Sequence, residues 1–323
     1  MILQLQSEIG SREMKNIDKN YFPGWVRKSI SFTIDDGNLE MDKKFIDTVS
    51  PYGIKGTFNI SNFHFDKLDE EGYRNFYRGF EIANHVRLHP HAFVDGVEYK
   101  IMDGPHPEEH PENTDVYPSE DEGVYMMKCP RGWRKITDAD TYLRLTRECT
   151  AEIERVFGKG KPIGFVWPFG MQKNEKLFEA LKKEGFYGLR KTGSTDDQTG
   201  YAIPLDRTAW SYNANNVQLL EFAKKYAAYP DDGELKTFIF GVHSIDFERS
   251  ENWCDLEAFA REYGNRPEEY WYATNGEIFA YEDAVKALVI TDEFIENPSD
   301  ISLYIKVDGE RIILAPYSKY KLS

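Results

Sequence analysis

Short runs of alternating apolar and polar residues mark the predicted strands of this chain. At residues 27–36, Ile30, Phe32 and Ile34 alternate with serine and threonine, which is the period of a half-buried β-strand. The segments with a similar strand-like pattern are 55–61, 79–85, 161–170, 187–191 and 235–244.

Apolar residues at helical spacing occupy the segments between these strands. The pattern is clearest at residues 137–158, where one helical stripe carries Tyr142, Leu145, Cys149, Ile153 and Val156. Thr137 is the expected N-cap of this helix and Gly158 its expected C-cap. Further helices are expected at 173–186, 214–229, 257–264 and 276–289. Strands that alternate with helices predict an α/β fold with a parallel sheet.

Two segments depart from this alternation. Residues 90–135 are rich in Pro, Gly, Asp and Glu without a sustained period, which predicts an inserted loop with a short hairpin. Near the C-terminus, alternating residues flank Asp308-Gly309, a strong hairpin signal. We therefore expect an N-terminal extension at 1–24, a main α/β domain at 25–290 and a small β-hairpin appendage at 291–323.

Composition and charge narrow the classes of partner. The 323 residues carry a formal net charge of −15, which argues against nucleic acid and against anionic membrane surfaces. The three cysteines are widely spaced and form no CxxC pair, so neither a thiol metal site nor a disulfide framework is indicated.

No apolar stretch is long enough for a transmembrane helix, and the first 20 residues lack the pattern of a signal peptide. We expect a cytoplasmic protein with no membrane partner. Export stays open, because a chain that had lost a leader would look the same, and the oligomeric state is not indicated.

Two adjacent carboxylates, Asp35 and Asp36, end the first predicted strand. Neighbouring acids repel each other unless a cation or a proton offsets the charge. His85 and His89 follow the third predicted strand, at a spacing that can point both imidazoles at one centre. Two imidazoles and one carboxylate, with a position left open, describe a catalytic metal site.

The other histidines need separate interpretations. His106 and His110 repeat the same spacing, but their acidic, proline-interrupted surroundings favour a surface loop. His91 is expected to point away from the candidate centre or into solvent. His243 ends an apolar strand, where it is either a satisfied core histidine or a general acid or base.

The order of four motifs is more specific than any one of them. "TIDDG" at 33–37, "HVRLH" at 85–89, "VWPFG" at 166–170 and "GVHS" at 241–244 together resemble the polysaccharide deacetylase family, also called the NodB-homology family or carbohydrate esterase family 4. The "TNGE" segment at 274–277 strengthens the resemblance. The resemblance implies a distorted (β/α) barrel and a divalent metal.

The resemblance also implies roles for single residues. Asp36, His85 and His89 would bind the metal, with zinc expected first and cobalt, manganese or nickel as alternatives. Asp35 would be the general base and His243 the general acid. Gly37 would let the backbone turn sharply behind the acidic pair.

A substrate-binding region is implied beside the "VWPFG" motif. The turn at Pro168 and Phe169 would offer a backbone N–H to the oxyanion. The candidate residues for the pocket wall are Trp167, Phe169, Trp210 and Tyr212.

Three positions depart from the family pattern. Val166 stands where the family has arginine, and Arg190 and Arg207 are candidates to replace that arginine. Val86 stands where the family has serine or threonine. The family's fourth motif is not found, and Asp206 is a candidate partner for His243.

The leading hypothesis is a metal-dependent deacetylase that acts on an N- or O-acetylated sugar. One alternative keeps the same hydrolytic site and turns it on a small-molecule amide. The other is a non-catalytic carbohydrate-binding relative of the fold, motivated by the missing arginine.

Overall fold

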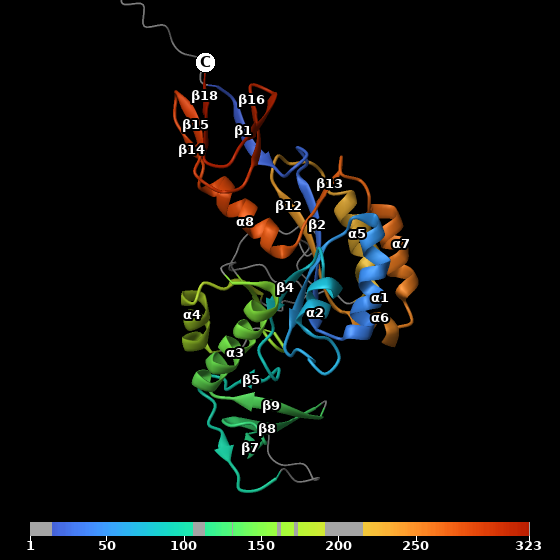
Figure 1. Cartoon of the computed structure of the whole chain (residues 1–323), viewed down its shortest axis with the longest axis vertical. Helices are drawn as coiled ribbons and strands as arrows, with labels where there is room; N and C mark the ends of the chain where they lie inside the picture. The colour runs from blue at the N-terminus through green and yellow to red at the C-terminus, as the bar shows by residue number, and fades with distance from the viewer. Residues whose placement is uncertain are drawn as a thin grey trace, which may run out of the picture.

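A curved parallel sheet forms the centre of the molecule (Figure 1). The computed structural model describes residues 15–105, 114–130, 132–159, 163–170, 174–190 and 216–322. The seven-stranded sheet runs in the order β11 (Tyr187–Arg190), β10 (Gly164–Val166), β4 (Glu81–Asn84), β3 (Gly56–Ile60), β2 (Lys28–Asp36) and β12 (Lys236–His243), with β13 (Tyr270–Tyr272) also paired to β2. Every pairing in this sheet is parallel, so the predicted α/β fold of the barrel type is confirmed.

Helices follow the strands, as the alternating pattern predicts. They are α1 (Leu39–Val49), α2 (Glu70–Phe76), α3 (Ala139–Phe157), α4 (Glu175–Lys183), α5 (Leu219–Ala227), α6 (Ser244–Arg249), α7 (Trp253–Tyr263) and α8 (Asn275–Lys286), with short 3₁₀ turns η1 (Ser50–Tyr52) and η2 (Asn216–Gln218). Figure 1 shows α1, α5, α6 and α7 on one side of β2 and β12, and α3 and α4 beside β4.

The predicted stripe of α3 is buried along its whole length, but the predicted N-cap is wrong by one residue. The Asp138 carboxylate accepts from the Thr141 N–H at 2.8 Å. Thr137 belongs to the preceding strand, and its hydroxyl donates to the Gly123 carbonyl. An acidic side chain at the N-cap also matches the helix dipole.

Strand β2 is buried on both faces, not half-buried as its alternation suggested. Its apolar residues pack against the helices, whereas its serines and Thr33 lie on the opposite face and are also buried. Two of these polar groups are hydrogen-bonded: the Ser31 hydroxyl donates to Asn275, and the Asn59 amide donates to Thr33. The alternation of apolar and polar residues along β2 therefore reflects two buried faces, one apolar and one polar. The polar face ends at Asp35.

The inserted segment is more ordered than predicted. The expected loop with one hairpin at 90–135 is a five-stranded sheet, in the order β5 (His91–Ala92), β9 (Gly132–Thr137), β8 (Val124–Cys129), β7 (Asp115–Pro118) and β6 (Lys100–Ile101). β8 and β9 form the antiparallel hairpin. Its strands are only two to six residues long, too short for a sustained period to show. Figure 1 shows this sheet beyond α3, at one end of the molecule.

The C-terminal residues form two small sheets, one of which includes a strand from residues 17–21. The hairpin predicted at Asp308-Gly309 joins β16 (Leu303–Val307) to β17 (Glu310–Leu314), with positive φ at both turn residues. β1 (Ile17–Tyr21) pairs with β16, so part of the expected 1–24 extension completes the C-terminal sheet. The second sheet contains β14 (Val289–Ile290), β15 (Phe294–Asn297) and β18 (Ser318–Lys321).

Within the described ranges, no helix combines the length and apolar character needed to cross a membrane.

Truncating Phe32 should strongly destabilise the main domain. This fully buried ring lies 5.2, 5.3 and 5.8 Å from the rings of Phe45, Phe259 and Phe240. We expect Phe32→Ala to lower the free energy of unfolding by about 3–5 kcal/mol, as measured by urea denaturation. Ile313→Ala, at a position 52% exposed, should change it by less than about 0.5 kcal/mol. Equal midpoints for the two variants would contradict this assignment of the core.

Candidate metal and catalytic site

The site lies where the parallel strands end. Asp35 and Asp36 end β2, His243 ends β12, and His85 directly follows β4. The register places His243 beside Asp35 across the β12–β2 pair. The carboxyl ends of parallel strands open on one edge of a sheet, which is the usual place for ligands in open α/β sheets.

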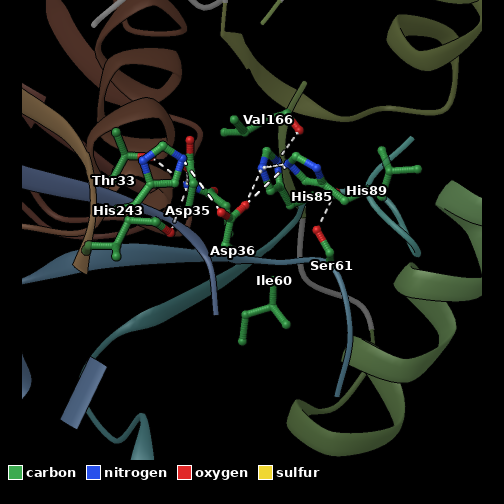
Figure 2. A network of polar contacts seen from close by, with 12 residues as sticks. Thr33, Asp35, Asp36, Ile60, Ser61, His85, His89, Val166 and His243 are labelled. Carbon is green, nitrogen blue, oxygen red and sulfur yellow. Dashed lines mark hydrogen bonds and ion pairs between the residues drawn. The ribbon is translucent and has the colours of Figure 1, made fainter. Parts of the chain in front are cut away.

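Asp36, His85 and His89 converge on one point (Figure 2). The Nε2 atoms of the two histidines are 3.1 Å apart, and Asp36 Oδ1 lies 3.5 Å from His85 Nε2 and 3.3 Å from His89 Nε2. Ligands at zinc-like bond lengths of about 2.1 Å in a tetrahedral arrangement are separated by about 3.4 Å. The donor types and their spacing both fit a divalent ion with three protein ligands.

Hydrogen bonding prepares His85 as a ligand. Its Nδ1 lies 2.8 Å from the Val166 carbonyl oxygen, which can only accept, so Nδ1 carries the proton. The lone pair of Nε2 is then directed toward Asp36 and His89. A ligand histidine held by a second hydrogen bond of this kind is the usual arrangement in metal sites.

The charge states also suit a cation site. Burial, together with the neighbouring His85, lowers the pKa of His89 to about 4, which keeps this imidazole neutral at pH 7. Although burial opposes it, interactions with the neighbouring His85, His89 and His243 hold the pKa of Asp36 well below its usual range. At pH 7, Asp36 is therefore a carboxylate and His89 a neutral imidazole, as a cation site requires.

Backbone strain is concentrated around these ligands. Ten non-glycine residues in the described ranges have positive φ. Five of them belong to the site and its motifs, namely Asp36, Val86, Leu88, His89 and Phe169. This conformation is especially unfavourable for a β-branched residue such as Val86, and strain of this kind is typical of functional sites. The imidazoles of His85 and His89 are therefore brought together by a loop with left-handed backbone conformations, not by a helical turn.

Two asparagines hold the strained loop in place. The Asn84 side chain accepts from the Val86 N–H at 2.8 Å and donates to the Thr146 carbonyl of α3. Asn62 accepts from the Leu88 N–H at 3.2 Å. Val86 itself is fully buried, so packing and hydrogen bonds replace the hydroxyl that the family motif has there.

Asp35 lies behind the ligand set and is only 7% exposed. The Asn59 amide donates to its Oδ1 at 2.7 Å, from the next strand in register. Asn59 thus orients the carboxylate that sequence analysis assigned as the base, which is one task expected of the arginine that Val166 replaces.

His243 has an acidic partner that sequence analysis missed. Its Nδ1 lies 2.8 Å from Asp246 Oδ2, and its Nε2 lies 3.7 Å from Asp36 Oδ2. Burial alone would lower its pKa, but the bond to Asp246 and the charges of Asp35 and Asp36 raise the pKa of His243 to about 9. The i, i+3 spacing into the first turn of α6 was the available signal. The proposed partner Asp206 lies outside the described residues.

The "VWPFG" turn lies next to the ligands. The Gly170 N–H donates to the Trp167 carbonyl at 3.1 Å, and the Phe169 ring packs edge-on against His89 with centroids 4.5 Å apart. Phe169 is 42% exposed, and its role as a pocket wall stays a prediction. Pro168 lies within this turn.

The prediction that Trp167 lines the pocket is wrong. Its side chain is 1% exposed and packs against Phe165 and Tyr142 in the core beside α3. Trp210, Tyr212 and Arg207 lie outside the described residues, as do His106 and His110. Of Arg190 only the backbone, in β11, is described.

Two residues from the inserted sheet reach this region unexpectedly. His91 does not point away: its ring stacks on Phe169 at 4.2 Å with an interplanar angle of 10°. The Arg134 guanidinium lies over the same Phe169 ring at 4.4 Å and is 3.3 Å from His91 Nε2. Because the insert showed no strand period, its contribution to the site could not be predicted.

Below His243, a buried acid in α1 supports the end of β12. Asp42 is fully buried and accepts hydrogen bonds from Ser244 at 2.6 Å and from Tyr77 at 2.8 Å. Burial, aided by the charge of Asp36 and opposed by these two hydrogen bonds, raises the pKa of Asp42 to about 7.

Comparisons with known proteins point to one family. The family model described as polysaccharide deacetylase matches residues 26–189. No curated protein matches the chain.

Solved structures with a similar chain course include the polysaccharide deacetylase Bc1974 from Bacillus cereus (13% identity, TM-score 0.42, 77% of this chain and 92% of that one). They also include the peptidoglycan deacetylase PdaC from Bacillus subtilis (14%, 0.44, 80% and 92%) and a CE4 esterase from Streptococcus mutans (13%, 0.42, 77% and 86%).

Replacing Asp42 should change how stability depends on pH. The folded chain holds the Asp42 proton up to about pH 7, whereas the unfolded chain releases it near pH 4. Between these values the folded state binds more protons, so the free energy of unfolding falls as pH rises.

Asp42→Asn cannot ionise and should therefore lose this fall. We therefore compare the free energy of unfolding of Asp42→Asn with that of wild type by urea denaturation at each pH. The variant's free energy of unfolding minus that of wild type should increase by about 3 kcal/mol from pH 4.5 to pH 7.5. The control is Asp47→Asn, an exposed position on the same helix that pairs with Lys43. A pH dependence that is unchanged in Asp42→Asn would show that Asp42 is ionised throughout.

Proposed function

The chain belongs to the polysaccharide deacetylase family, and we propose that it is a divalent-metal-dependent hydrolase that removes acetyl groups from an N- or O-acetylated sugar. The convergence of Asp36, His85 and His89 beside Asp35 and His243 supports this proposal most strongly.

Asp36, His85 and His89 would hold the ion, with zinc expected first because two imidazoles and one carboxylate are a common zinc set. Such an ion supplies Lewis acidity, which polarises an acetyl carbonyl and makes a nearby water more acidic. The Val166 carbonyl fixes the His85 tautomer, and the strained 86–89 loop fixes the position of His89.

Asp35 is placed to act as the base. It ends β2 next to the ligand Asp36 but has its own partner, because Asn59 donates to Oδ1. The carboxylate lies beside the ligand set, where it can take a proton from the attacking water. This separation of roles explains why the strand ends with two acids: one binds the cation and the other accepts the proton.

The turn at Phe169 supplies the oxyanion donor in this scheme. Among the described residues no acceptor bonds the Phe169 backbone N–H, and the ring of the same residue contacts the ligand His89. A backbone donor fixed by a tight turn stabilises developing negative charge without reorganisation.

His243 serves as the general acid. Its raised pKa of about 9 keeps it protonated at neutral pH, and Asp246 holds its Nδ1 proton. Nε2 then faces Asp36 and the candidate substrate position, where it can protonate the leaving amine or alkoxide.

Removing a ligand should abolish tight metal binding. Loss of a partner that only orients a ligand already costs about 10–100-fold in affinity, so we expect His89→Ala to bind zinc roughly 100-fold more weakly or worse. Elemental analysis after dialysis measures the stoichiometry. His64→Ala, which removes an exposed histidine elsewhere, should retain one ion per chain. Full occupancy in His89→Ala would remove His89 from the ligand set.

Asp35→Asn should separate catalysis from metal binding. The amide keeps the shape of the side chain and its acceptor for Asn59, but it cannot take a proton. Acetate release should fall by about 10²-fold or more in kcat, while zinc stoichiometry stays at the wild-type value. Full turnover in this variant would mean that another group is the base.

A further inference from the structure

We propose that Arg134 of the inserted sheet binds an anionic group of the substrate, so that the enzyme prefers acetylated sugars that carry a carboxylate. The inference rests on the proposed function only in taking the edge beside Phe169 as the place where the sugar binds.

The inserted sheet delivers Arg134 to this edge. β9 pairs with β5, whose first residue His91 lies beside Ile136. Arg134 is two residues before Ile136, so both lie on the face of the sheet that His91 shares. From this face the guanidinium reaches the exposed ring of Phe169.

Two short contacts connect Arg134 to the metal ligands. The Phe169 ring centroid lies 4.5 Å from that of His89 and 4.4 Å from the Arg134 guanidinium carbon. A sugar whose acetyl group sits at the Asp36, His85 and His89 centre would therefore bring a neighbouring substituent within reach of this cation.

Arg134 has no anionic partner in the described part of the chain. Among the described residues, its side chain makes a hydrogen-bond contact with His91 Nε2, at 3.3 Å. A guanidinium has five N–H donors, so most of them stay available. Neighbouring cations are different: Lys135 pairs with Asp121 at 2.7 Å and Arg144 with Glu148 at 2.7 Å.

The absence of a carboxylate here contrasts with the composition. The chain carries 55 acidic and 40 basic residues, yet none of the acidic residues in the described ranges pairs with Arg134. The donors along the edge of a guanidinium plane match a carboxylate in a bidentate manner. A substrate carboxylate would complete this arrangement.

Two matched substrates test the proposal. O-acetylated galacturonic acid oligosaccharides carry carboxylates, whereas O-acetylated xylooligosaccharides of the same length are neutral. For Arg134→Gln we expect kcat/KM on the acidic substrate to fall by about tenfold, mainly through KM, since a charge-assisted hydrogen bond is lost. The neutral substrate should change by less than about twofold.

Lys128→Gln is the matched control. It removes one positive charge from the same sheet, at a residue paired with Trp133 on the face opposite Arg134. This variant should leave the preference for the acidic substrate unchanged. Equal losses on both substrates in Arg134→Gln, or no loss on the acidic one, would overturn the proposal.

A binding measurement separates this proposal from the proposed function. Calorimetry with deacetylated galacturonic acid oligosaccharides requires no turnover. We expect wild type to bind them more tightly than neutral xylooligosaccharides, and Arg134→Gln to lose about tenfold of that affinity. If wild type releases no acetate from either substrate but shows this difference, O-deacetylation of these sugars fails and anion recognition stands. Equal binding of the acidic oligosaccharide by both proteins refutes anion recognition, whatever the activity.

Discussion

Parallel pairing of β2 with β3 and β12 determines where every reactive side chain lies. In-register parallel strands end together, so Asp35, Asn59 and His243 come side by side from three distant segments. β4 ends one strand further along, and the loop after it brings back His85 and His89. The hydrogen bonds with Asn59, Val166 and Asp246 then orient the side chains that this pairing brings together.

The second constraint is the cost of placing two carboxylates next to each other at the end of a buried strand. The fold assigns them different surroundings: Asn59 binds the buried Asp35, and three imidazoles surround Asp36. The polar interior face of β2 makes this possible, because it replaces an apolar interior with hydrogen-bonding groups that lead toward Asp35. Strained backbone at Asp36 and His89 is a further cost at this edge, as expected where ligands must point inward.

Much of this could be predicted from the sequence, and what was missed has physical reasons. Alternating patterns predicted the parallel sheet and most helices, and motif order predicted the five residues that converge. Partners outside the motifs were missed: Asp246 acts through an i, i+3 contact in α6, and Arg134 sits in an insert without a visible period. Trp167 was misassigned because a tryptophan beside a motif looks the same in sequence whether it packs in the core or lines a pocket.

X-ray absorption spectroscopy of the zinc-loaded protein can test whether Asp36, His85 and His89 form one metal centre. If they do, the ion has two imidazole nitrogens and at least one carboxylate-type oxygen at about 2.0–2.2 Å. A zinc shell without imidazole scattering, or one with sulfur from the cysteines, would contradict this assignment.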